Sequence, residues 1–524
     1  MIKISDQDFK WIKSLPADSL KFIRGIEKEG LRVTPEGKIS QLPHPQNLGA
    51  ALTHPSITTD YSEALLEFIT PAKDSTDDLM NYLQELHQFT YQNIADDELI
   101  WPGSMPAIIK DELDIKIAEY GSSNIGRLKH IYRHGLWHRY GRTMQSIAGL
   151  HFNFSMPESF WTHYHEQQKS NLPLTEFQSA SYFRMIRNFR RHSWLLMYLF
   201  GASPAIDNSF LDTDESLKSA GKHTKYLPYG SSIRMSDVGY TNKAQDVLNI
   251  SFDGLNEYIS SLRKAIHQVH KPYQALGQKK DGEYLQINSN ILQIENEYYS
   301  DVRPKRVGAS GEKPVCALSR SGVEYVEIRC MDLDPFEPLG ICKDSIHFLE
   351  AFMTWCLLES EETISEEEAL HLKFNLKTVV HDGLRPGLEL FDQGVKTPIQ
   401  QMINERLDSI HQLAMAIDQA KSTDKFKRAV SAAKHKADNP DTIASNKLRK
   451  RLEQGEDYSD IMLDLARQHK KTLNQQALSK EKRQQFEELA IQSHKEQAEL
   501  ESSDDIPFEI FMEDYQHQDD KYCV

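Results

Sequence analysis

Acidic side chains occur on two short segments near the start of the chain that otherwise look like β-strands. The first segment reads RGIEKEGLR and ends at Arg32. Because side chains alternate between the two faces of a strand, Glu27 and Glu29 are expected to share one face, opposite Lys28. Carboxylates gathered on one face repel one another unless a cation lies between them. The pattern therefore indicates either a site for a positively charged ligand or carboxylates that are dispersed on the surface.

The second segment, TTDYSEALLEF, covers residues 58–68. Glu63, Leu65 and Glu67 follow one another at the alternating spacing, so they are expected to share one side. Asp60 precedes them, at the entrance of the strand. This segment therefore repeats the acidic pattern of the first.

Two later segments alternate in the same way. LHFNFS places His151 on a polar face and Phe152 on an apolar face. In EYVEIRC, Glu327 and Arg329 share one face and Ile328 takes the other. A single histidine on a strand is more often a hydrogen-bonded core residue than a metal ligand, so this pattern alone does not decide the role of His151.

Repulsion between the carboxylates limits how they can be arranged. The candidates for one shared site are Glu27, Glu29, Asp60, Glu67 and Glu327. If they lay about 6 Å apart, each like-charge pair would cost about 3 kcal/mol, and all pairs together on the order of 20–30 kcal/mol. That exceeds the net stability of a domain, about 5–15 kcal/mol. Either the carboxylates are dispersed, or divalent cations neutralise them, and oxygen ligands favour Mg²⁺ or Mn²⁺ over zinc.

Composition limits the class of protein. The length of 524 residues favours two or three domains, and the formal net charge of −16 disfavours nucleic acid or an anionic membrane as the main partner. No stretch approaches the roughly 20 apolar residues of a membrane span, and the amino terminus lacks the apolar run of a signal peptide. We therefore expect a cytoplasmic protein. Its five cysteines form no CxxC pair and are expected to be mostly reduced thiols.

The chain divides into three regions. Residues 1–380 mix short alternating segments with helical ones and form the expected catalytic region, whereas residues 381–502 show almost only helical periodicity and are expected to pack on it. Residues 503–524 form an acidic tail, and the stretch 496–520 holds ten carboxylates with no Lys or Arg. Such a charge imbalance is typical of partial disorder.

Several helices are predicted from apolar residues spaced three, four and seven positions apart. This spacing, typical of amphipathic helices, occurs within residues 79–86, 349–356, 410–417 and 458–465. Ser365, followed by Glu368, also has the spacing of a capping box and predicts the start of a further helix.

The usual nucleotide-binding and hydrolase motifs are absent. GSSNIGRLK, at residues 121–129, approaches the phosphate-loop pattern but has Arg127 where the lysine belongs. Neither HExxH nor GxSxG occurs in the chain. If the protein uses ATP, metal ions rather than a phosphate loop are expected to hold the phosphates.

Eight sequence blocks resemble, in the same order, the glutamate–cysteine ligases of the proteobacterial type. They read RGIEKEGLR, ALTHPSITTDYSEALLEFITP, SSNIGRLKHIYRHGLWHRYG, MQSIAGLHFNFS, LFGASPA, RMSDVGYTNK, LQINSNILQIENEYY and VEYVEIRCMDLDP. Together they lie along most of residues 10–380, and long blocks in one order are far more specific than any single motif. Residues beyond about 400 resemble the family only weakly, and no functional role is assigned to them.

The resemblance implies an α+β fold related to glutamine synthetase. A curved, mainly antiparallel sheet would form a funnel surrounded by helices, with metal-binding residues on its inner face. The metal positions of the family fall on Glu27, Glu29, Asp60, Glu67, His151 and Glu327. Strand alternation agrees for all of them except Asp60, which must be placed by the bend before its strand. Mg²⁺ is the expected ion, and the nitrogen ligand would suit Mn²⁺ as well.

The resemblance also implies the reaction. ATP would phosphorylate the γ-carboxylate of L-glutamate, and the amine of L-cysteine would then displace phosphate from γ-glutamyl phosphate, the first step of glutathione biosynthesis. Arg329 and Glu327 are expected to act in catalysis, the guanidinium by stabilising the transferred phosphoryl group. The positions that resemble the amino-acid pocket of the family are Tyr61, Tyr132, Leu136, Gln145, Arg234, Tyr240 and Tyr299.

Two other functions remain possible from the residues. The chain could be another carboxylate–amine ligase that joins glutamate to a different amine, which the tyrosine-rich pocket positions argue against. It could also be a catalytically silent metal-binding regulator, although all six metal positions and Arg329 are filled. In each case the expected partners are small molecules rather than nucleic acid or membrane, and a monomer is expected because no heptad seam is legible.

Overall fold

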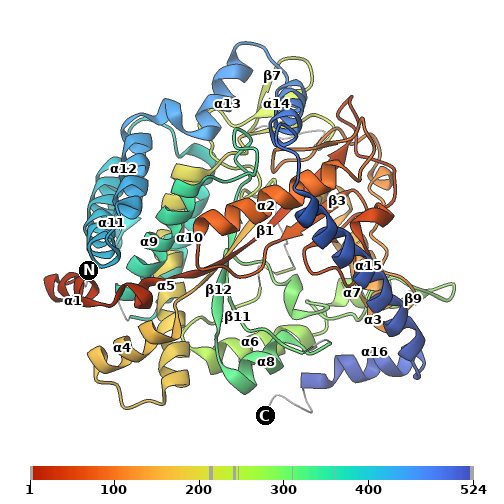
Figure 1. Cartoon of the computed structure of the whole chain (residues 1–524), viewed down its shortest axis with the longest axis horizontal. Helices are drawn as coiled ribbons and strands as arrows, with labels where there is room; N and C mark the ends of the chain where they lie inside the picture. The colour runs from red at the N-terminus through yellow and green to blue at the C-terminus, as the bar shows by residue number, and fades with distance from the viewer. Residues whose placement is uncertain are drawn as a thin grey trace.

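The computed structural model describes residues 4–211, 216–239, 244–245, 247–309, 311–359 and 362–519. A seven-stranded antiparallel sheet runs through its centre, in the order β11-β12-β5-β1-β3-β2 with β4 beside β1 (Figure 1). Its strands are β1 (Ile23–Val33), β2 (Ile57–Thr59), β3 (Leu65–Ile69), β4 (Leu99–Ile100), β5 (Leu150–Ser155), β11 (Val302–Lys305) and β12 (Tyr325–Met331). The sheet is open, and the predicted α+β class with a mainly antiparallel sheet is confirmed.

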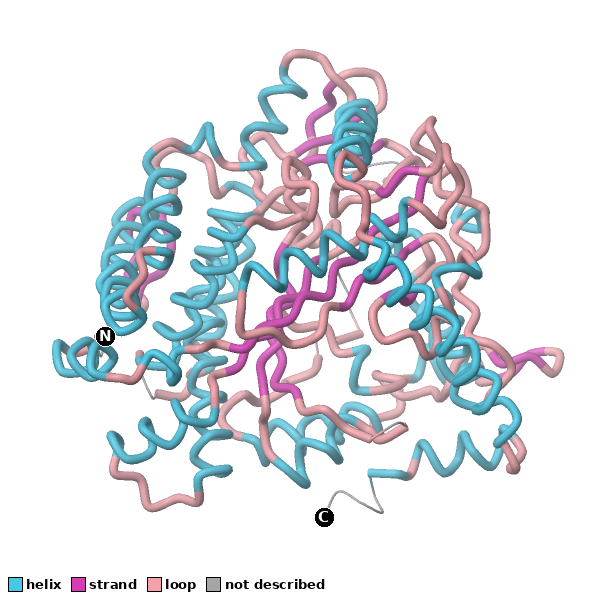
Figure 2. Tube along the Cα trace, in the orientation of Figure 1, coloured by secondary structure: helices cyan, strands magenta, loops and turns pink. Residues whose placement is uncertain are grey.

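Helices surround the sheet (Figure 2). Those of the first part of the chain are α1 (Asp6–Ser14), α2 (Thr76–Tyr91), α3 (Asn124–Tyr140), α4 (Glu158–Gln168), α5 (Leu174–Phe200), α6 (Leu255–His267), α7 (Lys271–Leu276), α8 (Pro314–Ser321), α9 (Lys343–Leu358) and α10 (Glu366–Asp382). Those of the second part are α11 (Ile399–Lys421), α12 (Lys425–Asp438), α13 (Ala444–Glu453), α14 (Tyr458–Leu473), α15 (Lys480–Ser503) and α16 (Phe508–Gln516).

Smaller strands complete the structure. They form one three-stranded sheet and two hairpins: β6 (Ala205–Asp207), β7 (Lys218–Ala220) and β8 (Thr224–Tyr226), then β9 (Lys279–Lys280) with β10 (Glu283–Tyr284), and β13 (Glu389–Asp392) with β14 (Val395–Pro398). None of these contributes a strand to the central sheet.

The predicted helical segments all lie inside helices, namely α2, α9, α11 and α14. The helix predicted from Ser365 is also present, because Ser365 Oγ accepts a hydrogen bond from the Glu368 amide at 3.1 Å at the start of α10. The Glu368 carboxylate bonds to Arg191, so only the Ser365 half of the predicted capping box forms. Apolar side chains of these helices belong to the same buried cluster as those of the sheet. Helices α11 to α15 therefore share one continuous core with the strands.

The two faces of the central sheet differ as the alternation predicts. Ile26, Phe152 and Ile328 are fully buried on one face, in the apolar core beside α2 and α5. On the other face, Glu29 lies directly opposite Glu67 on the neighbouring strand. One face therefore stabilises the fold by burying apolar surface, and the other gathers acidic side chains.

The acidic end of the chain is more ordered than expected. Phe508 and Met512 of α16 are buried against Leu128 and Ile131 of α3. Asp519 is buried too, and its Oδ2 lies 2.7 Å from His267 Nε2. The prediction of disorder is therefore wrong for the described part of this tail. Apolar residues spaced along one side of α16 supply a packing face that the count of carboxylates concealed.

The cysteines follow the expectation in part. Cys330, Cys342 and Cys356 are free thiols, whereas Cys316 is disulfide-bonded.

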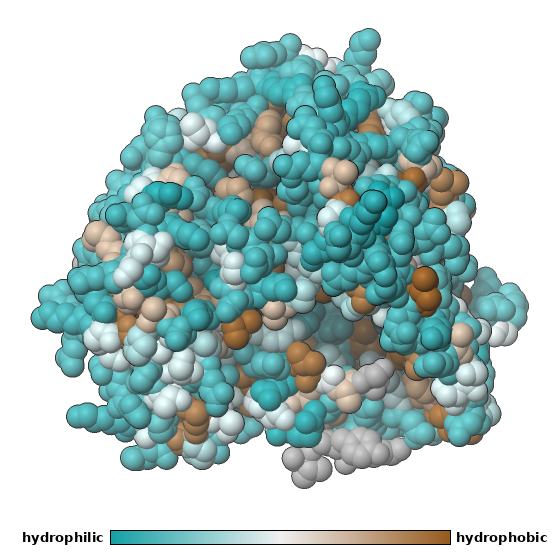
Figure 3. Space-filling model, in the orientation of Figure 1, coloured by the Kyte–Doolittle hydropathy of each residue, from teal (hydrophilic) through white to brown (hydrophobic). Residues whose placement is uncertain are grey.

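The surface of the face shown in Figure 3 is mostly hydrophilic, with small and scattered hydrophobic patches. Among the described residues, no helix is long and apolar enough to cross a membrane.

Lys28 is an unusual member of the apolar face. Its side chain is buried, and its Nζ lies 2.9 Å from His87 Nε2. Burial lowers the pKa of Lys28 to about 7. Between pH 7 and 10.5 the unfolded chain therefore binds a proton at this residue that the folded chain does not, so folding stability should rise with pH there by about 1.4 kcal/mol per pH unit.

Lys28→Met is expected to remove this pH dependence. The variant should gain stability over the parent on the order of a few kcal/mol at pH 7, and this advantage should shrink as the pH approaches 10.5. Urea unfolding of both proteins across that range measures the difference, with the exposed Lys38→Met as the matched control. A difference that stays constant with pH would show that Lys28 keeps its charge in the folded protein.

Candidate active site

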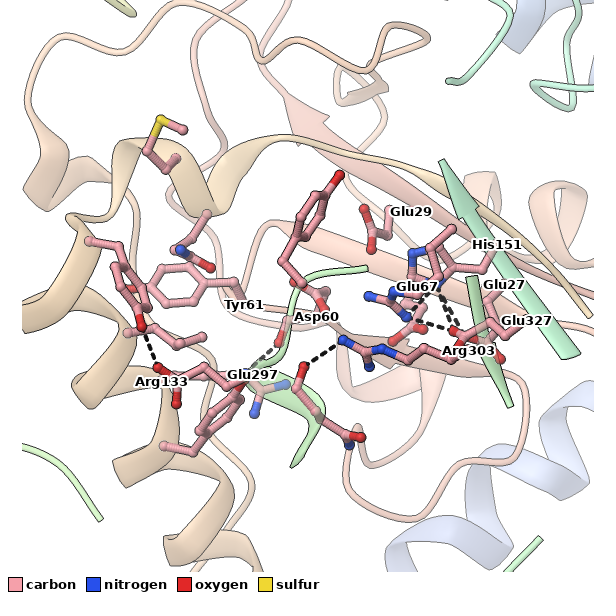
Figure 4. A pocket seen from close by; sticks show the side chains of 18 of the residues that line it. Glu27, Glu29, Asp60, Tyr61, Glu67, Arg133, His151, Glu297, Arg303 and Glu327 are labelled. Atoms are coloured by element: carbon pink, nitrogen blue, oxygen red, sulfur yellow. Dashed lines mark hydrogen bonds and ion pairs between the residues drawn. The ribbon is translucent and has the colours of Figure 1, made fainter. Parts of the chain in front are cut away.

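A pocket of about 310 Å³ opens over the acidic face of the central sheet (Figure 4). Strands β1, β3, β5, β11 and β12 form its floor, α3 forms one wall, and residues 296–299 form another. All six predicted metal-binding residues line it, together with Arg329. The residues that were predicted to share one site therefore line one pocket.

Three of these residues lie closest together. The side-chain nitrogen His151 Nδ1 lies 3.3 Å from Glu27 Oε2 and 3.3 Å from Glu327 Oε1. The register explains this, because Glu27 lies opposite His151 across the β1–β5 pair. One donor atom from each residue falls within 4.8 Å of the others, which is compact enough for all three to bind a single ion.

The other three acidic residues lie next to this group. Glu29 and Glu67 face each other across β1 and β3, and the Glu29 carboxylate accepts the Gly149 amide at 2.5 Å. Asp60 lies in the turn between β2 and β3, as the bend in its segment requires. Arg133 of α3 fixes this turn, because its Nε donates to the Asp60 carbonyl at 2.5 Å.

Glu63 does not join the cluster. It lies in the same turn, before β3 begins, so strand alternation does not apply to it. Its carboxylate instead accepts the backbone amides of His44 and Glu119, each at 2.7 Å. The expectation that it shares a side with Glu67 is therefore wrong.

The pKa values of the carboxylates reflect their crowding. Burial, and then the charge of Asp60, raises the pKa of Glu29 to about 8. Burial and the charges of Glu27 and Asp60 hold the pKa of Glu67 well above its ordinary value. The positive side chains near the cluster therefore do not balance its negative charges.

Glu327 has the opposite shift. Burial alone would raise its pKa, but the charges of Arg329 and Lys305 hold it well below the ordinary value. Arg329 Nη1 donates to Glu327 Oε1 at 2.6 Å, and Lys305 Nζ lies 3.4 Å from Oε2. Apart from this ion pair with Lys305, no donor among the described residues makes a hydrogen bond to the buried Glu327 Oε2.

These features fit a divalent cation. The donor set is five carboxylates and one imidazole, which suits Mg²⁺ or Mn²⁺. The buried Glu327 Oε2, which accepts no hydrogen bond among the described residues, and the raised pKa of Glu29 are both what a site shaped for an added positive charge would show. Figure 4 shows Glu27, Glu67, His151 and Glu327 grouped at one end of the pocket, away from Tyr61 and Arg133.

Two cations of β11 were missed by the sequence analysis. Arg303 and Lys305 alternate with Pro304, so both point toward the pocket, and Arg303 lies opposite Glu327 in the register. Arg303 is buried and donates to the Asn296 carbonyl at 3.0 Å. The sequence contains one sign of this arrangement, because two cations flank Pro304. Proline is tolerated in an edge strand such as β11, so the segment could have been predicted as a strand with both cations on one face.

Most of the residues that were predicted to bind the amino-acid substrates lie in this pocket. Five of them line the pocket: Tyr61, Tyr132, Leu136, Gln145 and Tyr299. Tyr240 lies outside the described residues. Tyr132 and Leu136 come from one face of α3, which explains why residues four apart in sequence reach the same cavity.

Arg234 is buried beside the pocket rather than in its lining. Its guanidinium donates to the Arg329 carbonyl at 2.8 Å and to the Met331 carbonyl at 3.3 Å. A Cβ at Gly149 would collide with this guanidinium, so a glycine is required there. Arg234 thus supports the end of β12. Its charge also offsets part of the rise in the pKa of Glu29.

Glu297 is a further lining residue without a sequence signal of its own. Its Oε1 accepts Arg139 Nη1 at 3.0 Å and Tyr140 OH at 2.6 Å. Its Oε2 accepts the Gln293 amide at 2.6 Å. These contacts fix the wall formed by residues 296–299 against the end of α3.

One protein-family model matches most of the chain. The family model described as glutamate–cysteine ligase matches residues 11–379. The glutamate–cysteine ligase of Hahella chejuensis is 47% identical over 497 residues, covering 94% of this chain and 95% of the relative. The enzyme of the same name from Pseudomonas aeruginosa is 47% identical over 496 residues, covering 94% of each chain.

Solved structures agree with the sequence relatives. The crystal structure of glutamate–cysteine ligase from Francisella tularensis in complex with AMP superposes with a TM-score of 0.90 at 35% identity, over 96% of this chain and 99% of that chain. A bifunctional glutathione synthetase from Pasteurella multocida gives a TM-score of 0.69 at 26% identity, over 87% of this chain and 53% of that chain.

Proposed function

Because the chain belongs to the glutamate–cysteine ligase family, we propose that the pocket over the central sheet is its active site. The protein is a ligase that uses ATP to join the γ-carboxylate of L-glutamate to the amino group of L-cysteine through γ-glutamyl phosphate, the first step of glutathione biosynthesis. The observation that carries the placement is the meeting of six metal-type ligands and four cationic side chains in one cavity.

The first chemical step is phosphoryl transfer. An oxygen of the glutamate γ-carboxylate attacks the γ-phosphorus of ATP, and the bond from that phosphorus to the bridging oxygen breaks to release ADP. We assign Arg329, Lys305 and Arg303 to the negative charge of the transferred group, because fixed cations need no reorganisation during the reaction. Glu327 holds Arg329 in position through their 2.6 Å hydrogen bond.

The second step forms the amide. The lone pair of the cysteine nitrogen attacks the acyl carbon, the bond from carbon to the phosphate oxygen breaks, and phosphate leaves with the proton that the nitrogen loses. Water would destroy the acyl phosphate, so the site must exclude it. Tyr61, Tyr132 and Leu136 form an apolar part of the lining that would serve this purpose and contact the amino acids.

We propose Mg²⁺ as the ion of this site, held by Glu27, Glu29, Asp60, Glu67, His151 and Glu327. When bound, such an ion supplies positive charge to phosphate oxygens. Among the described residues, Glu27, His151 and Glu327 form the one group compact enough to hold a single ion, and Glu67 lies beside it, opposite Glu29. The protein is further proposed to act as a monomer in the cytoplasm, and its net charge of −16 argues against nucleic acid as a partner.

The reaction itself is tested by ADP release. With ATP and Mg²⁺ present, release is expected to require both L-glutamate and L-cysteine, and omission of either should reduce it to background. Release with glutamate and a different amine would identify another carboxylate–amine ligase. No release under any of these conditions would instead favour a metal-binding regulator.

Arg234, buried beside the pocket with its guanidinium on two backbone carbonyls and 3.8 Å from Asp332 Oδ1, is proposed to attract the α-carboxylate of an amino-acid substrate by its charge. Arg234→Ala is expected to raise the Michaelis constant of that amino acid at least about tenfold and that of ATP much less, because it removes this positive charge from beside the pocket. It should also lower the melting temperature, since the Arg329 and Met331 carbonyls lose a buried donor. Steady-state kinetics with each substrate varied in turn decides the assignment. A rise confined to the ATP constant would show that Arg234 serves the nucleotide.

A further inference from the structure

Two histidines occupy successive turns of α3 on the side away from the pocket. His130 and His134 are four residues apart, so they lie on one face of the helix, whereas Tyr132 and Leu136 point from the opposite face into the active site. The centroids of the two imidazole rings are 4.7 Å apart. This spacing of two imidazoles on a helix is the one that metalloproteins use to hold a zinc ion.

The ring of His130 is oriented as in a metal ligand. Its Nδ1 lies 2.8 Å from the Ala118 carbonyl oxygen, which can only accept a hydrogen bond. The proton of the neutral ring is therefore on Nδ1, and the lone pair is on Nε2. Metal-binding histidines are commonly fixed by this same bond to a backbone carbonyl.

Both rings line a second cavity, of about 410 Å³, on the outer side of α3. Its other lining residues are Pro43, Glu63, Lys116, Ile117, Glu119 and Arg142. Two of these are carboxylates, but among the described residues they form no compact three-residue ligand group with the imidazoles. The Glu63 carboxylate is fixed there by the His44 and Glu119 amides.

The two cations of this cavity donate hydrogen bonds to backbone carbonyls, although the charge of Arg142 still lowers the pKa of the neighbouring His134. Lys116 Nζ donates to the Gln41 carbonyl at 2.8 Å, and Arg142 Nη1 donates to the Ile115 carbonyl at 3.0 Å. The Arg142 guanidinium also lies over the Trp137 ring, 3.8 Å from its centroid. Burial, and then His130, lowers the pKa of His134 to about 4, so its ring is neutral at neutral pH.

We propose that His130 and His134 chelate a divalent transition-metal ion, Zn²⁺ or Cu²⁺, on the outer face of α3. Imidazole nitrogen selects these ions over Mg²⁺, whereas the carboxylate cluster of the active site selects Mg²⁺. Water completes the coordination.

The test uses Cu²⁺ as the probe on the full-length protein with Mg²⁺ at saturation, so that the carboxylate cluster is occupied. Electron paramagnetic resonance should show two equivalent nitrogen ligands at one equivalent of Cu²⁺. His130→Gln and His134→Gln should each leave one nitrogen at this site. Each should also weaken Cu²⁺ binding at least about tenfold, since even loss of an outer-shell partner costs about 10–100-fold.

His138→Gln is the matched control, because this residue lies one turn further along α3 and outside the cavity. Binding should be unchanged in this variant, and all three variants should melt near the parent temperature. The proposal is overturned if neither His130→Gln nor His134→Gln alters the Cu²⁺ spectrum. It is also overturned if His138→Gln weakens binding and His130→Gln does not, because the ligands would then be His134 and His138.

Discussion

Replacing Glu27 or Glu67 with glutamine is expected to lower turnover at least about a hundredfold, because each change removes a negative charge from the ligands of the proposed metal site. The change keeps the shape of the side chain, so folding should survive. Glu27 lies within the compact group around His151, and Glu67 lies in the second group opposite Glu29. The two variants therefore test both halves of the cluster.

Stability should change in the opposite direction. Like charges crowd Glu67 strongly enough to hold its pKa well above the ordinary value, after burial as the main cause. In the absence of metal, Glu67→Gln should therefore melt at a higher temperature than the metal-free parent. Added Mg²⁺ should stabilise the parent more than the variant, because binding to the folded state raises its stability.

Calorimetry with and without Mg²⁺, together with turnover at saturating Mg²⁺, provides both readouts. Glu36→Gln is the matched control, since this carboxylate is exposed in the turn after β1 and outside the pocket. It should change neither turnover nor the effect of Mg²⁺. Near-normal turnover of both Glu27→Gln and Glu67→Gln would remove the basis for a metal site at these residues.

The acidic face of the sheet could be predicted from sequence because alternation is a local property of strands. Glu27, Glu29 and Glu327 lie on regular strands, where the backbone alone decides the direction of each side chain. Glu63 failed the same argument because it lies in the turn before β3. Alternation therefore locates a side chain only after the ends of the strand are known.

Residues that act through tertiary contacts gave no comparable signal. Arg303 and Lys305 lie on a four-residue edge strand whose pattern is interrupted by Pro304. Arg234 comes from a loop, and its contacts with the end of β12 join positions about 95 residues apart. The packing of α16 against α3 depends on the spacing of its apolar residues, and the many carboxylates of this stretch make that spacing easy to overlook. These features require the folded chain.

Arg329→Lys and Ile328→Ala are expected to damage the protein in two different ways. Arg329 lies on the pocket side of β12, with Nη1 2.6 Å from Glu327 Oε1 and 3.5 Å from His151 Nδ1. Lysine keeps the charge but loses the planar fork that can hold two phosphate oxygens and Glu327 at once. Turnover should therefore fall at least about tenfold with little change in melting temperature.

Ile328 is fully buried on the opposite face of the same strand. Its replacement by alanine opens a cavity in the core and should cost about 2–5 kcal/mol of folding stability. The turnover of the molecules that remain folded should be close to that of the parent, because no pocket atom is removed. Denaturant unfolding and active-site-normalised turnover separate the two effects.

The pair tests the orientation of β12 as well as the two side chains. If Arg329→Lys left turnover nearly unchanged while Ile328→Ala abolished chemistry in a stably folded protein, the strand would present its other face to the substrates. Glu327 shares the face of Arg329, so its position among the metal ligands would fail with the same result. Loss of turnover in the arginine variant and loss of stability in the isoleucine variant would place Arg329 at the pocket and Ile328 in the core, as the structure does.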